Sequence, residues 1–356
     1  MMNSLQEEET IKKFVQINEN GLFSINGEPV LNKDQGLIWQ NSLTLDDRGR
    51  LIAKIDDEPT LVEVYDEPFI AQSITKLSDS DRWLIQLPYE ATAEFDPTKV
   101  TLDEWDRFHG ETLSGHIPFV MNRQAQDQFF NAVDEFDDES ITIKGQRHQV
   151  HPWLAVNESI SSSVFWSEIY QNEQPRWDLH APSPALTDFV PSLKLQKSKV
   201  LVLGSGPGND AAWFAENGHI VTAVDFSDEA IQLSRSRYGH LPNIEFVKSD
   251  IFTLPKEFEN KFDLVFEHTC YCAIEPSRRT ELMNVWRRSL VNQGHLMAVF
   301  FVHHKPFGPP YGGSEWEVRR RLNKSFRPLY WTRMKNSIPS RLGTELFVYA
   351  QKINQF

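Results

Sequence analysis

Residues 199–210 read KVLVLGSGPGND, an apolar run followed by three closely spaced glycines. The run KVLVL has the length and aliphatic composition of a buried strand, and Asn209 opens a predicted helix. Between strand and helix the chain must turn sharply, which glycines 204, 206 and 208 permit because they have no Cβ. A strand, a glycine loop and a helix in this order bring the backbone against a ligand at the carboxyl end of a parallel sheet.

The spacing of the glycines indicates which ligand this is. A dinucleotide-binding fingerprint needs its third glycine three residues after the second, and Asn209 occupies that position. The observed G-x-G-x-G, with Gly204, Gly206 and Gly208 before a helix, is typical of domains that bind S-adenosylmethionine. An ordinary strand-to-helix turn is the structural alternative.

An acidic residue follows at the distance that such a site requires. Asp225 ends the next apolar run, IVTAVD, 21 residues beyond Gly204. This is close to the interval of about 20 residues at which a carboxylate meets ribose hydroxyls. The sequence therefore predicts that Asp225, with Phe226 directly after it, contacts the cofactor.

Two further carboxylates end strand-like runs. Asp250 ends the third strand in KSDIF, where domains of this kind place a carboxylate near the adenine amino group, with Ile251 beside the ring. Alternatively, Asp250 caps a turn. Glu267 ends the fourth run, FDLVFE, and the carboxyl ends of the strands are where open α/β sheets bind ligands.

The second half of the chain alternates apolar runs with helical segments, which is typical of a mostly parallel sheet with helices on both faces. The predicted strands are KVLVLG, IVTAVD, IEFVKSD, FDLVFE and HLMAVFFV, and the predicted helices cover residues 209–216, 228–238 and 279–290. Ser227 can cap the second helix, and Pro276 can open the third. FRPLYWTRM and ELFVYAQKI are expected to form an antiparallel pair at the edge of the sheet.

The first half differs in pattern and in charge. Residues 1–150 contain 13 basic and 29 acidic side chains, a net charge of −16, whereas the remainder has 23 and 21. Short alternating strands over residues 21–89 and a helix over residues 123–135 indicate a smaller β-rich α+β domain. We expect domains at 1–150 and 164–356, joined by a linker at 151–163, and the acidic charge argues against nucleic-acid binding by the first.

Composition limits where the protein functions and which sites it contains. The opening MMNSLQEEET is not a secretory signal, and no run of 18 apolar residues occurs, so we expect a cytoplasmic protein without membrane attachment. Cys270 and Cys272 are too few for a structural zinc site and are expected to be reduced. The histidines of the first domain are too irregularly spaced to predict a metal site.

The motifs of the second half resemble those of the thiopurine S-methyltransferase family, especially its thiol and halide/thiocyanate methyltransferase branch. The resemblance covers about residues 164–350 and rests on FWSEIYQNEQPRWDLHAPSPAL, VLGSGPGND, AVDFSDEAI, EFVKSDIF, FDLVFEHTCYCAIEPSRR and GPPYGGSEWE. It implies a class I Rossmann-like methyltransferase with a mostly parallel seven-stranded sheet. Residues 1–150 lie outside it.

The resemblance also implies roles for individual residues. Trp166 and Trp177 would form an N-terminal lid over the cofactor, although both could instead belong to the core. Glu267 would lie beside the transferred methyl group, and Arg279 would approach the acceptor, although it could also be a solvated arginine on a helix face. Ser205 and the Ser277-Arg278 pair depart from the family wording, which leaves the acceptor open. The cofactor contacts that it carries over are Gly204, Gly206, Gly208, Asp225, Asp250 and Ile251.

These patterns predict methyl transfer from S-adenosylmethionine to a small sulfur nucleophile, either a thiol or an anion such as thiocyanate. In-line displacement by sulfur depends mainly on orientation, and thiols with a pKa of about 8.5 are partly ionised at neutral pH. Methylation of oxygen or nitrogen is the enzymatic alternative and would require a base, for which His303 and His304 are candidates. A cofactor sensor whose output lies in the first domain is the non-enzymatic alternative.

Overall fold

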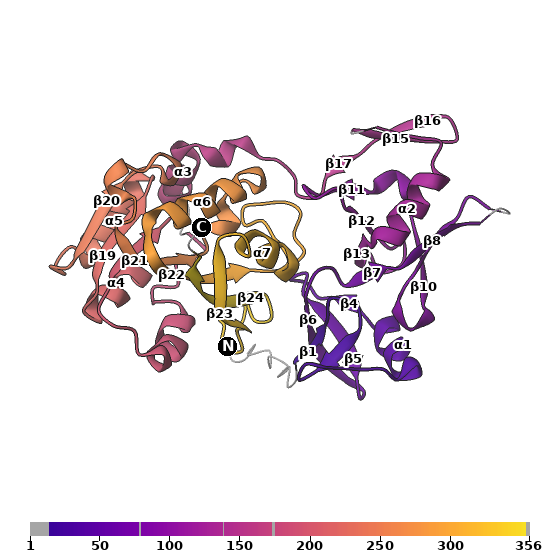
Figure 1. The fold of residues 1–356 in the computed structure, drawn as a ribbon, viewed down its shortest axis with the longest axis horizontal. Coiled ribbons are helices and arrows are strands. Elements are labelled where there is room, and N and C mark those ends of the chain that lie inside the picture. The colour runs from indigo at the N-terminus through magenta and orange to yellow at the C-terminus, as the bar shows by residue number, and fades with distance from the viewer. Residues whose placement is uncertain (1–13, 78–79, 138, 173–174, 354–356) are drawn as a thin grey trace, which may run out of the picture. The chain divides into compact units, whose positions relative to one another are not determined.

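The computed structural model describes residues 14–77, 80–137, 139–172 and 175–353, which form two compact units with a boundary between Trp153 and Leu154 (Figure 1). This boundary falls within the expected linker at 151–163, of which residues 153–157 form neither helix nor strand. Strand β17 (His151–Pro152) pairs with β11 (Thr101–Leu102) of the first unit, and a 3-10 helix, Glu158–Ser161, already belongs to the second.

The N-terminal unit is rich in short strands arranged in four sheets. Their orders are β3-β2-β1-β6-β5-β4, β10-β9-β8, β17-β11-β12-β13-β7 and β14-β15-β16. The strands not yet located are β1 (Phe14–Ile17), β2 (Phe23–Ile25), β3 (Glu28–Pro29), β4 (Thr44–Leu45), β5 (Leu51–Ile55), β6 (Glu58–Val64), β7 (Phe69–Ala71), β8 (Ser73–Lys76), β9 (Trp83–Gln86), β10 (Thr92–Phe95), β12 (Phe108–Glu111), β13 (Pro118–Met121), β14 (Glu135–Asp137), β15 (Ser140–Ile143) and β16 (Gln146–Gln149).

Two helices complete this unit, and each differs from the sequence expectation. Helix α1 (Lys33–Asn41) was not predicted, because its polar sequence has little helical periodicity; Asn32 caps it by accepting the N–H of Gln35. Helix α2 (Arg123–Ala132) is shorter than expected. The acidic residues that follow form β14 rather than the end of a helix, because they pair with β15.

The core of the N-terminal unit is aromatic but includes a buried ion cluster. Phe95, Phe108, Phe119 and Phe129 are fully buried and pack edge-on. His109 lies between two carboxylates: its Nδ1 is 3.2 Å from Glu67 and its Nε2 is 3.1 Å from Asp103. Burial lowers the pKa of His109, but the bonds to Asp103 and Glu67 outweigh this and raise it.

The C-terminal unit is a single seven-stranded sheet, as predicted. Its order is β20-β19-β18-β21-β22-β24-β23, and only the pairings that involve β24 are antiparallel. The strands are β18 (Lys199–Leu203), β19 (Ile220–Asp225), β20 (Ile244–Lys248), β21 (Phe262–His268), β22 (Leu290–Phe301), β23 (Phe326–Arg333) and β24 (Glu345–Lys352). The predicted antiparallel pair at the edge is therefore confirmed.

Alternation along the central strand divides the core between the two faces of the sheet. Leu201 and Leu203 of β18 pack in one hydrophobic cluster with Trp286, and Val200 and Val202 pack in the other with Phe214. The first face is covered by α6 (Arg279–Ser289) and α7 (Glu315–Leu322), and the second by α4 (Asn209–Glu216).

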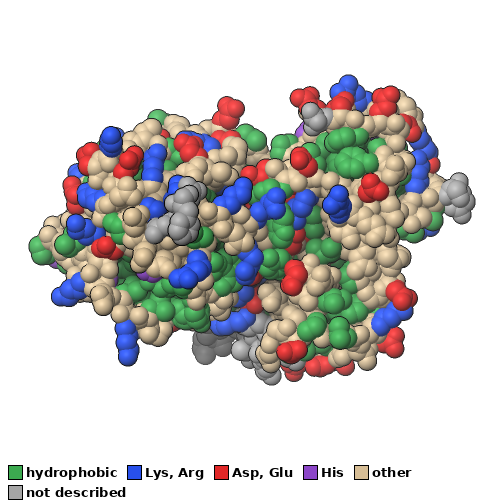
Figure 2. Space-filling view, in the orientation of Figure 1, with side chains coloured by type: hydrophobic (Ala, Val, Ile, Leu, Met, Phe, Trp, Pro, Cys, Tyr) green, Lys and Arg blue, Asp and Glu red, His purple; other side chains and the backbone are tan. Residues whose placement is uncertain are grey.

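The remaining helices of this unit include α3 (Ser163–Asn172) and α5 (Asp228–Tyr238). Ser227 caps α5 as predicted, because its hydroxyl accepts the N–H of Ala230. On the face shown in Figure 2, acidic and basic side chains are interspersed over this unit, in keeping with its small net charge. Within the described residues, no helix has the length and apolar character needed to span a membrane.

Candidate active site

A cavity of 510 Å³ lies where the parallel strands end. Its walls come from the glycine loop after β18, from the residues that end or follow β19, β20 and β21, and from the end of β22. Helix α3 and Trp177 contribute a further wall. The cavity therefore occupies the position at which open α/β sheets bind ligands.

The three glycines of the loop have different roles. Gly204 and Gly206 line the cavity, and both have positive φ. A Cβ on Gly204 would lie 2.6 Å from Sγ of Cys270, and a Cβ on Gly206 would lie 3.1 Å from the hydroxyl of Tyr170. The loop can approach a ligand because both positions lack a side chain.

Gly208, which was expected to contact the cofactor, is absent from the cavity wall. It has a φ of 86° and caps the start of α4. A Cβ there would lie 2.9 Å from Ser234 of α5 and 3.2 Å from Phe246 of β20. Gly208 thus allows close packing of the elements behind the loop.

Asp225 lies at one end of the cavity and is 9% exposed, with Phe226 beside it in the lining. Its Oδ2 accepts the N–H of Gly206 at 2.8 Å, and its Oδ1 accepts that of Ser227 at 3.0 Å. Burial raises the pKa of this carboxyl, although backbone N–H donors oppose the shift. Since a carboxylate offers about four lone-pair sites, it retains the capacity to bind ligand hydroxyls.

Asp250 and Ile251, for which adenine contacts were predicted, also line the cavity. Asp250 accepts the N–H of Phe252 at 2.8 Å and caps the 3-10 helix Ile251–Thr253. Both interpretations of Asp250, as a turn cap and as a lining residue, are thus compatible. The guanidinium of Arg278 lies over the ring of Phe252, 3.5 Å from its centroid. Both residues line the cavity, so an aromatic ring and a cation lie together in its wall.

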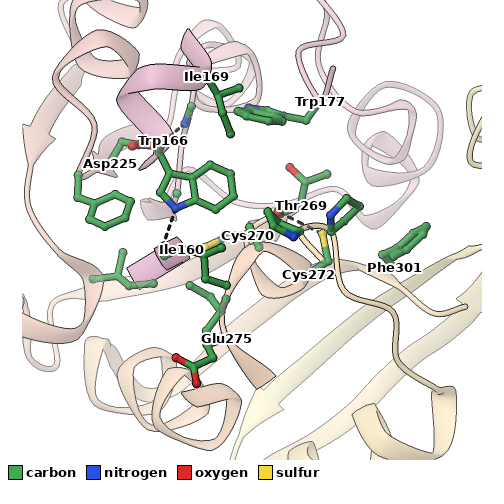
Figure 3. A pocket seen from close by; sticks show the side chains of 18 of the residues that line it. Ile160, Trp166, Ile169, Trp177, Asp225, Thr269, Cys270, Cys272, Glu275 and Phe301 are labelled. Atoms are coloured by element: carbon green, nitrogen blue, oxygen red, sulfur yellow. Dashed lines mark hydrogen bonds between the residues drawn. The ribbon is translucent and has the colours of Figure 1, made fainter. Parts of the chain in front are cut away.

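Both tryptophans of the expected lid line the cavity. The indole N–H of Trp166 donates to the carbonyl of Ile160 at 2.8 Å, and that of Trp177 donates to the hydroxyl of Tyr170 at 3.2 Å. The two indoles meet edge to face with centroids 5.6 Å apart. Figure 3 shows Trp166 and Trp177 over the cavity, together with Ile169.

Glu267 lies below the cavity rather than in its wall. It is fully buried, and its Oε1 accepts the N–H of Tyr271 at 2.7 Å. Burial raises its pKa to about 7. Glu267, which was expected beside the transferred methyl group, is thus absent from the cavity lining, and its carboxyl supports the turn that carries Thr269 and Cys270 to the cavity.

Arg279, which was expected to approach the acceptor, is likewise absent from the cavity lining. It is fully buried and donates to Glu317 at 3.0 Å and to the carbonyl of Gly312 at 2.8 Å. The adjacent Arg278 does line it. One residue along a helical turn rotates a side chain by about 100°, so sequence position alone does not separate the two.

The end of the cavity away from Asp225 has a different character. Figure 3 shows Asp225 at one end and Phe301 at the other, with Thr269, Cys270 and Cys272 between them. Val299, Pro309 and Pro310 add apolar surface to the lining, which also includes the charged residues Arg341 and Glu345. Glu345 pairs with Phe301 between β24 and β22. We call this region the acceptor end. Burial and the charge of Glu267 raise the pKa of Cys272 to about 12, so its thiol is a neutral wall group.

An ion network that the sequence did not predict borders the acceptor end. His268, the last residue of β21, has Nδ1 2.8 Å from Asp210 and Nε2 3.1 Å from Arg341. Arg341 also donates to Glu345 at 3.4 Å and to the carbonyl of Trp177 at 3.5 Å. In the sequence, the only feature that pointed to His268 was its position directly after Glu267.

Among the described residues that line the cavity there is no histidine. His303 and His304, expected as candidate bases, are absent from its wall; His303 forms a β-bridge with Gly313. In the described ranges, no three His, Cys, Asp or Glu residues gather in a way that would hold a metal ion.

Comparison with known proteins gives consistent matches for the C-terminal unit. A family model for thiopurine S-methyltransferase matches residues 161–341 and leaves residues 1–160 unmatched. Probable thiol methyltransferase 2 of Arabidopsis thaliana is 30% identical over 185 residues, which is 51% of this chain and 79% of that protein. Thiocyanate methyltransferase 1 of Arabidopsis thaliana is 29% identical over 195 residues, 53% of this chain and 85% of that protein.

A solved structure gives a more distant comparison. The 1,6-didemethyltoxoflavin-N1-methyltransferase of Burkholderia thailandensis, with bound 1,6-didemethyltoxoflavin and S-adenosylhomocysteine, is 21% identical, with a TM-score of 0.47. The match covers 62% of this chain and 99% of that one.

Proposed function

The chain belongs to the thiopurine S-methyltransferase family, and from this premise we propose that it transfers a methyl group from S-adenosylmethionine to a small sulfur nucleophile. The acceptor class is a thiol or a thiocyanate-like anion. Methyl transfer that depends on S-adenosylmethionine is the activity of the family as a whole; the choice of sulfur is the proposal.

The residues at the Asp225 end fit S-adenosylmethionine. The absence of Cβ atoms at Gly204 and Gly206 leaves room at the loop, because side chains there would meet Cys270 and Tyr170. Asp225 would bind the ribose, and Asp250 and Ile251 would border the adenine. The cofactor supplies an electrophilic methyl group on a sulfonium.

The observation that carries the proposal is the guanidinium of Arg341 at the apolar acceptor end. A fixed cation beside an apolar wall attracts a polarisable anion and lowers the pKa of a thiol, which increases the thiolate fraction. Arg341 thereby takes the role that the sequence assigned to Arg279. Glu345 offsets part of its charge at 3.4 Å.

In the reaction, a lone pair of the acceptor sulfur forms the new bond to the methyl carbon while the bond from that carbon to the sulfonium breaks. The chain contributes orientation, for which about 7 to 11 kcal/mol is available when reacting atoms are held in line. Trp166 and Trp177 limit the access of water to this space. A thiol acceptor reacts as the thiolate after releasing its proton to water, and a thiocyanate anion has none to lose.

Methylation of oxygen or nitrogen is the competing enzymatic hypothesis, and it would need a base at the acceptor end. Glu345 is the carboxylate placed there, but its bonds to Arg341 and Ser337 already engage both oxygens. This arrangement favours sulfur. We further propose a cytoplasmic location, which the two free thiols of Cys270 and Cys272 support.

A turnover assay with labelled S-adenosylmethionine tests the proposal. The acceptor panel contains small thiols, thiocyanate, iodide, phenols and amines. Methylated sulfur products are the expected result. Transfer only to phenols or amines would replace the sulfur proposal, and cofactor binding without transfer to any acceptor would favour a sensing role.

A further inference from the structure

The ion network behind the acceptor end links four residues from three parts of the C-terminal unit. Asp210 lies in the first turn of α4, His268 ends β21, and Arg341 and Glu345 come from the turn before β24 and from its first residue. The side chain of His268 is 7% exposed and that of Glu345 is 6% exposed. Arg341 belongs to the cavity wall, whereas His268 lies behind it.

The donors and acceptors allow one arrangement of protons. A guanidinium only donates, so the 3.1 Å contact between Arg341 and Nε2 of His268 is a hydrogen bond only if Nε2 carries no proton. The proton of neutral His268 is then on Nδ1 and is donated to Asp210 at 2.8 Å. The observed contacts therefore correspond to a neutral imidazole that holds Arg341 in place.

From this geometry we propose that His268 is a positioning residue for Arg341, and that protonation of His268 releases Arg341 and weakens binding of an anionic acceptor. The inference rests on the proposed function. It adds a pH-dependent control of acceptor capture within the same site.

Protonation changes the contacts in a definite way. A proton on Nε2 would point at the N–H groups of Arg341. The imidazolium and the guanidinium, both cations and both hydrogen-bond donors, would then repel each other at 3.1 Å. An alternative acceptor for that proton is Glu345, 3.9 Å away, which is also a partner of Arg341. Arg341 would thus lose its bond to His268 and share Glu345, and it would keep only the 3.5 Å bond to the carbonyl of Trp177.

The charged groups around His268 determine where this change occurs. Burial and the positive charge of Arg341 lower the pKa of His268. The charge and hydrogen bond of Asp210 and the charge of Glu345 raise it, and the net effect is a raised pKa. Glu267 precedes it on β21 and interacts with it electrostatically. His268 therefore loses its proton at a pH above the usual histidine pKa of about 6.5. Arg341 becomes fixed as the pH rises through the pKa of His268.

Steady-state kinetics of the full-length enzyme with thiocyanate test this inference. Thiocyanate is ionised throughout the accessible pH range, so any titration belongs to the protein. At saturating S-adenosylmethionine, we expect KM for thiocyanate to fall about 10-fold as the pH rises from about 6 to about 9, with a smaller change in kcat. Calorimetric binding of thiocyanate to the complex with S-adenosylhomocysteine should show the same trend.

Three variants separate positioning from general structural damage. In His268→Gln the amide oxygen can still accept from Arg341 but cannot titrate, so KM should be low and independent of pH. In His268→Leu the anchor is lost, so KM should be high at every pH. His295→Gln changes a half-buried histidine of the same sheet, which is stacked on Tyr349, and should keep the wild-type profile.

The outcomes are distinguishable. A wild-type KM that does not vary with pH, or a His268→Gln variant with the wild-type pH profile, would overturn the inference while leaving the proposed function intact. Failure of the wild type to methylate thiocyanate or any thiol would overturn the proposed function, and this inference with it.

Discussion

At the scale of single residues, Asp225 combines two tasks in one carboxylate. It anchors the glycine loop through Gly206 and the start of α5 through Ser227, and it lines the cavity where the ribose is expected. Substitution therefore affects both the shape of the loop and a direct ligand contact.

We expect Asp225→Ala to weaken binding of S-adenosylmethionine at least about 10-fold, because charge-assisted hydrogen bonds to hydroxyls contribute about 1.5 to 3 kcal/mol each. Isothermal titration calorimetry measures this directly. Asp228→Ala, three residues away on the exposed side of α5, is the matched control and should bind normally. Unchanged affinity of the Asp225 variant would contradict the role in ribose binding.

Glu267 is a fully buried carboxyl next to the cavity-lining turn at residues 269–270. Its buried carboxyl supports the turn at Tyr271, and burial raises its pKa from 4.5 to about 7. The unfolded chain releases this proton near 4.5, whereas the native state retains it until about 7. Native stability therefore falls as the pH rises between these values, by up to about 3 kcal/mol.

Glu267→Gln should remove this pH dependence while keeping an oxygen that can accept from Tyr271. We expect the variant to gain stability relative to the wild type at pH 8 but not at pH 4.5, as measured by urea unfolding of the C-terminal unit. Glu245→Gln, an exposed position on β20, controls for the change of charge. An equal effect of the Glu267 substitution at both pH values would show that its carboxyl does not titrate in this way.

At the scale of elements, the strand β18, the glycine loop and helix α4 form the structural centre of the site. The sequence identified all three elements correctly, because their signals are local: a short apolar run, glycines and a helix start. It did not reveal that the three glycines face different neighbours. Gly208 faces Ser234 and Phe246, which are brought to it by α5 and β20.

Gly208→Ala should destabilise the C-terminal unit by about 1 to 3 kcal/mol, because the new Cβ adds a clash to an unfavourable positive φ. The matched control is Gly27→Ala in the N-terminal unit. Gly27 has the same φ of 86° but no atom within 4 Å of the added Cβ, so its substitution measures the backbone cost alone. Thermal unfolding of both variants gives the comparison, and equal losses would exclude the packing role of Gly208.

At the scale of the whole molecule, the protein consists of two units with separate cores. The C-terminal unit contains the entire cavity and both clusters that flank its sheet. The N-terminal unit has its own aromatic core and the buried His109 cluster. This division coincides with the change in charge along the chain.

Residues 154–356 alone should therefore fold cooperatively and retain methyl transfer within a few-fold of the full chain. Calorimetry and the turnover assay measure the two properties, with the full-length protein as the reference. A fragment that folds but is inactive would show that the N-terminal unit contributes to catalysis.

The sequence by itself determined the succession of strands and helices in the C-terminal unit, the methyltransferase fold and most of the residues at the Asp225 end of the cavity. Gly204, Gly206, Asp225, Asp250 and Ile251 line the cavity as predicted, as do both lid tryptophans and Phe226. These residues stand at strand ends or in a loop, and parallel strands bring their carboxyl ends to one edge of the sheet. Their roles in binding the cofactor remain predictions.

Only the tertiary structure decided the acceptor end. His268 and Arg341 meet across 73 positions of the chain, and no local pattern marks either residue as a partner of the other. The choice between Arg278 and Arg279 likewise depends on how helical turns rotate side chains, and the burial of Glu267 depends on which side of β21 its side chain faces. Periodicity and turn chemistry act over a few residues, whereas this end of the site is assembled by packing between segments far apart in sequence.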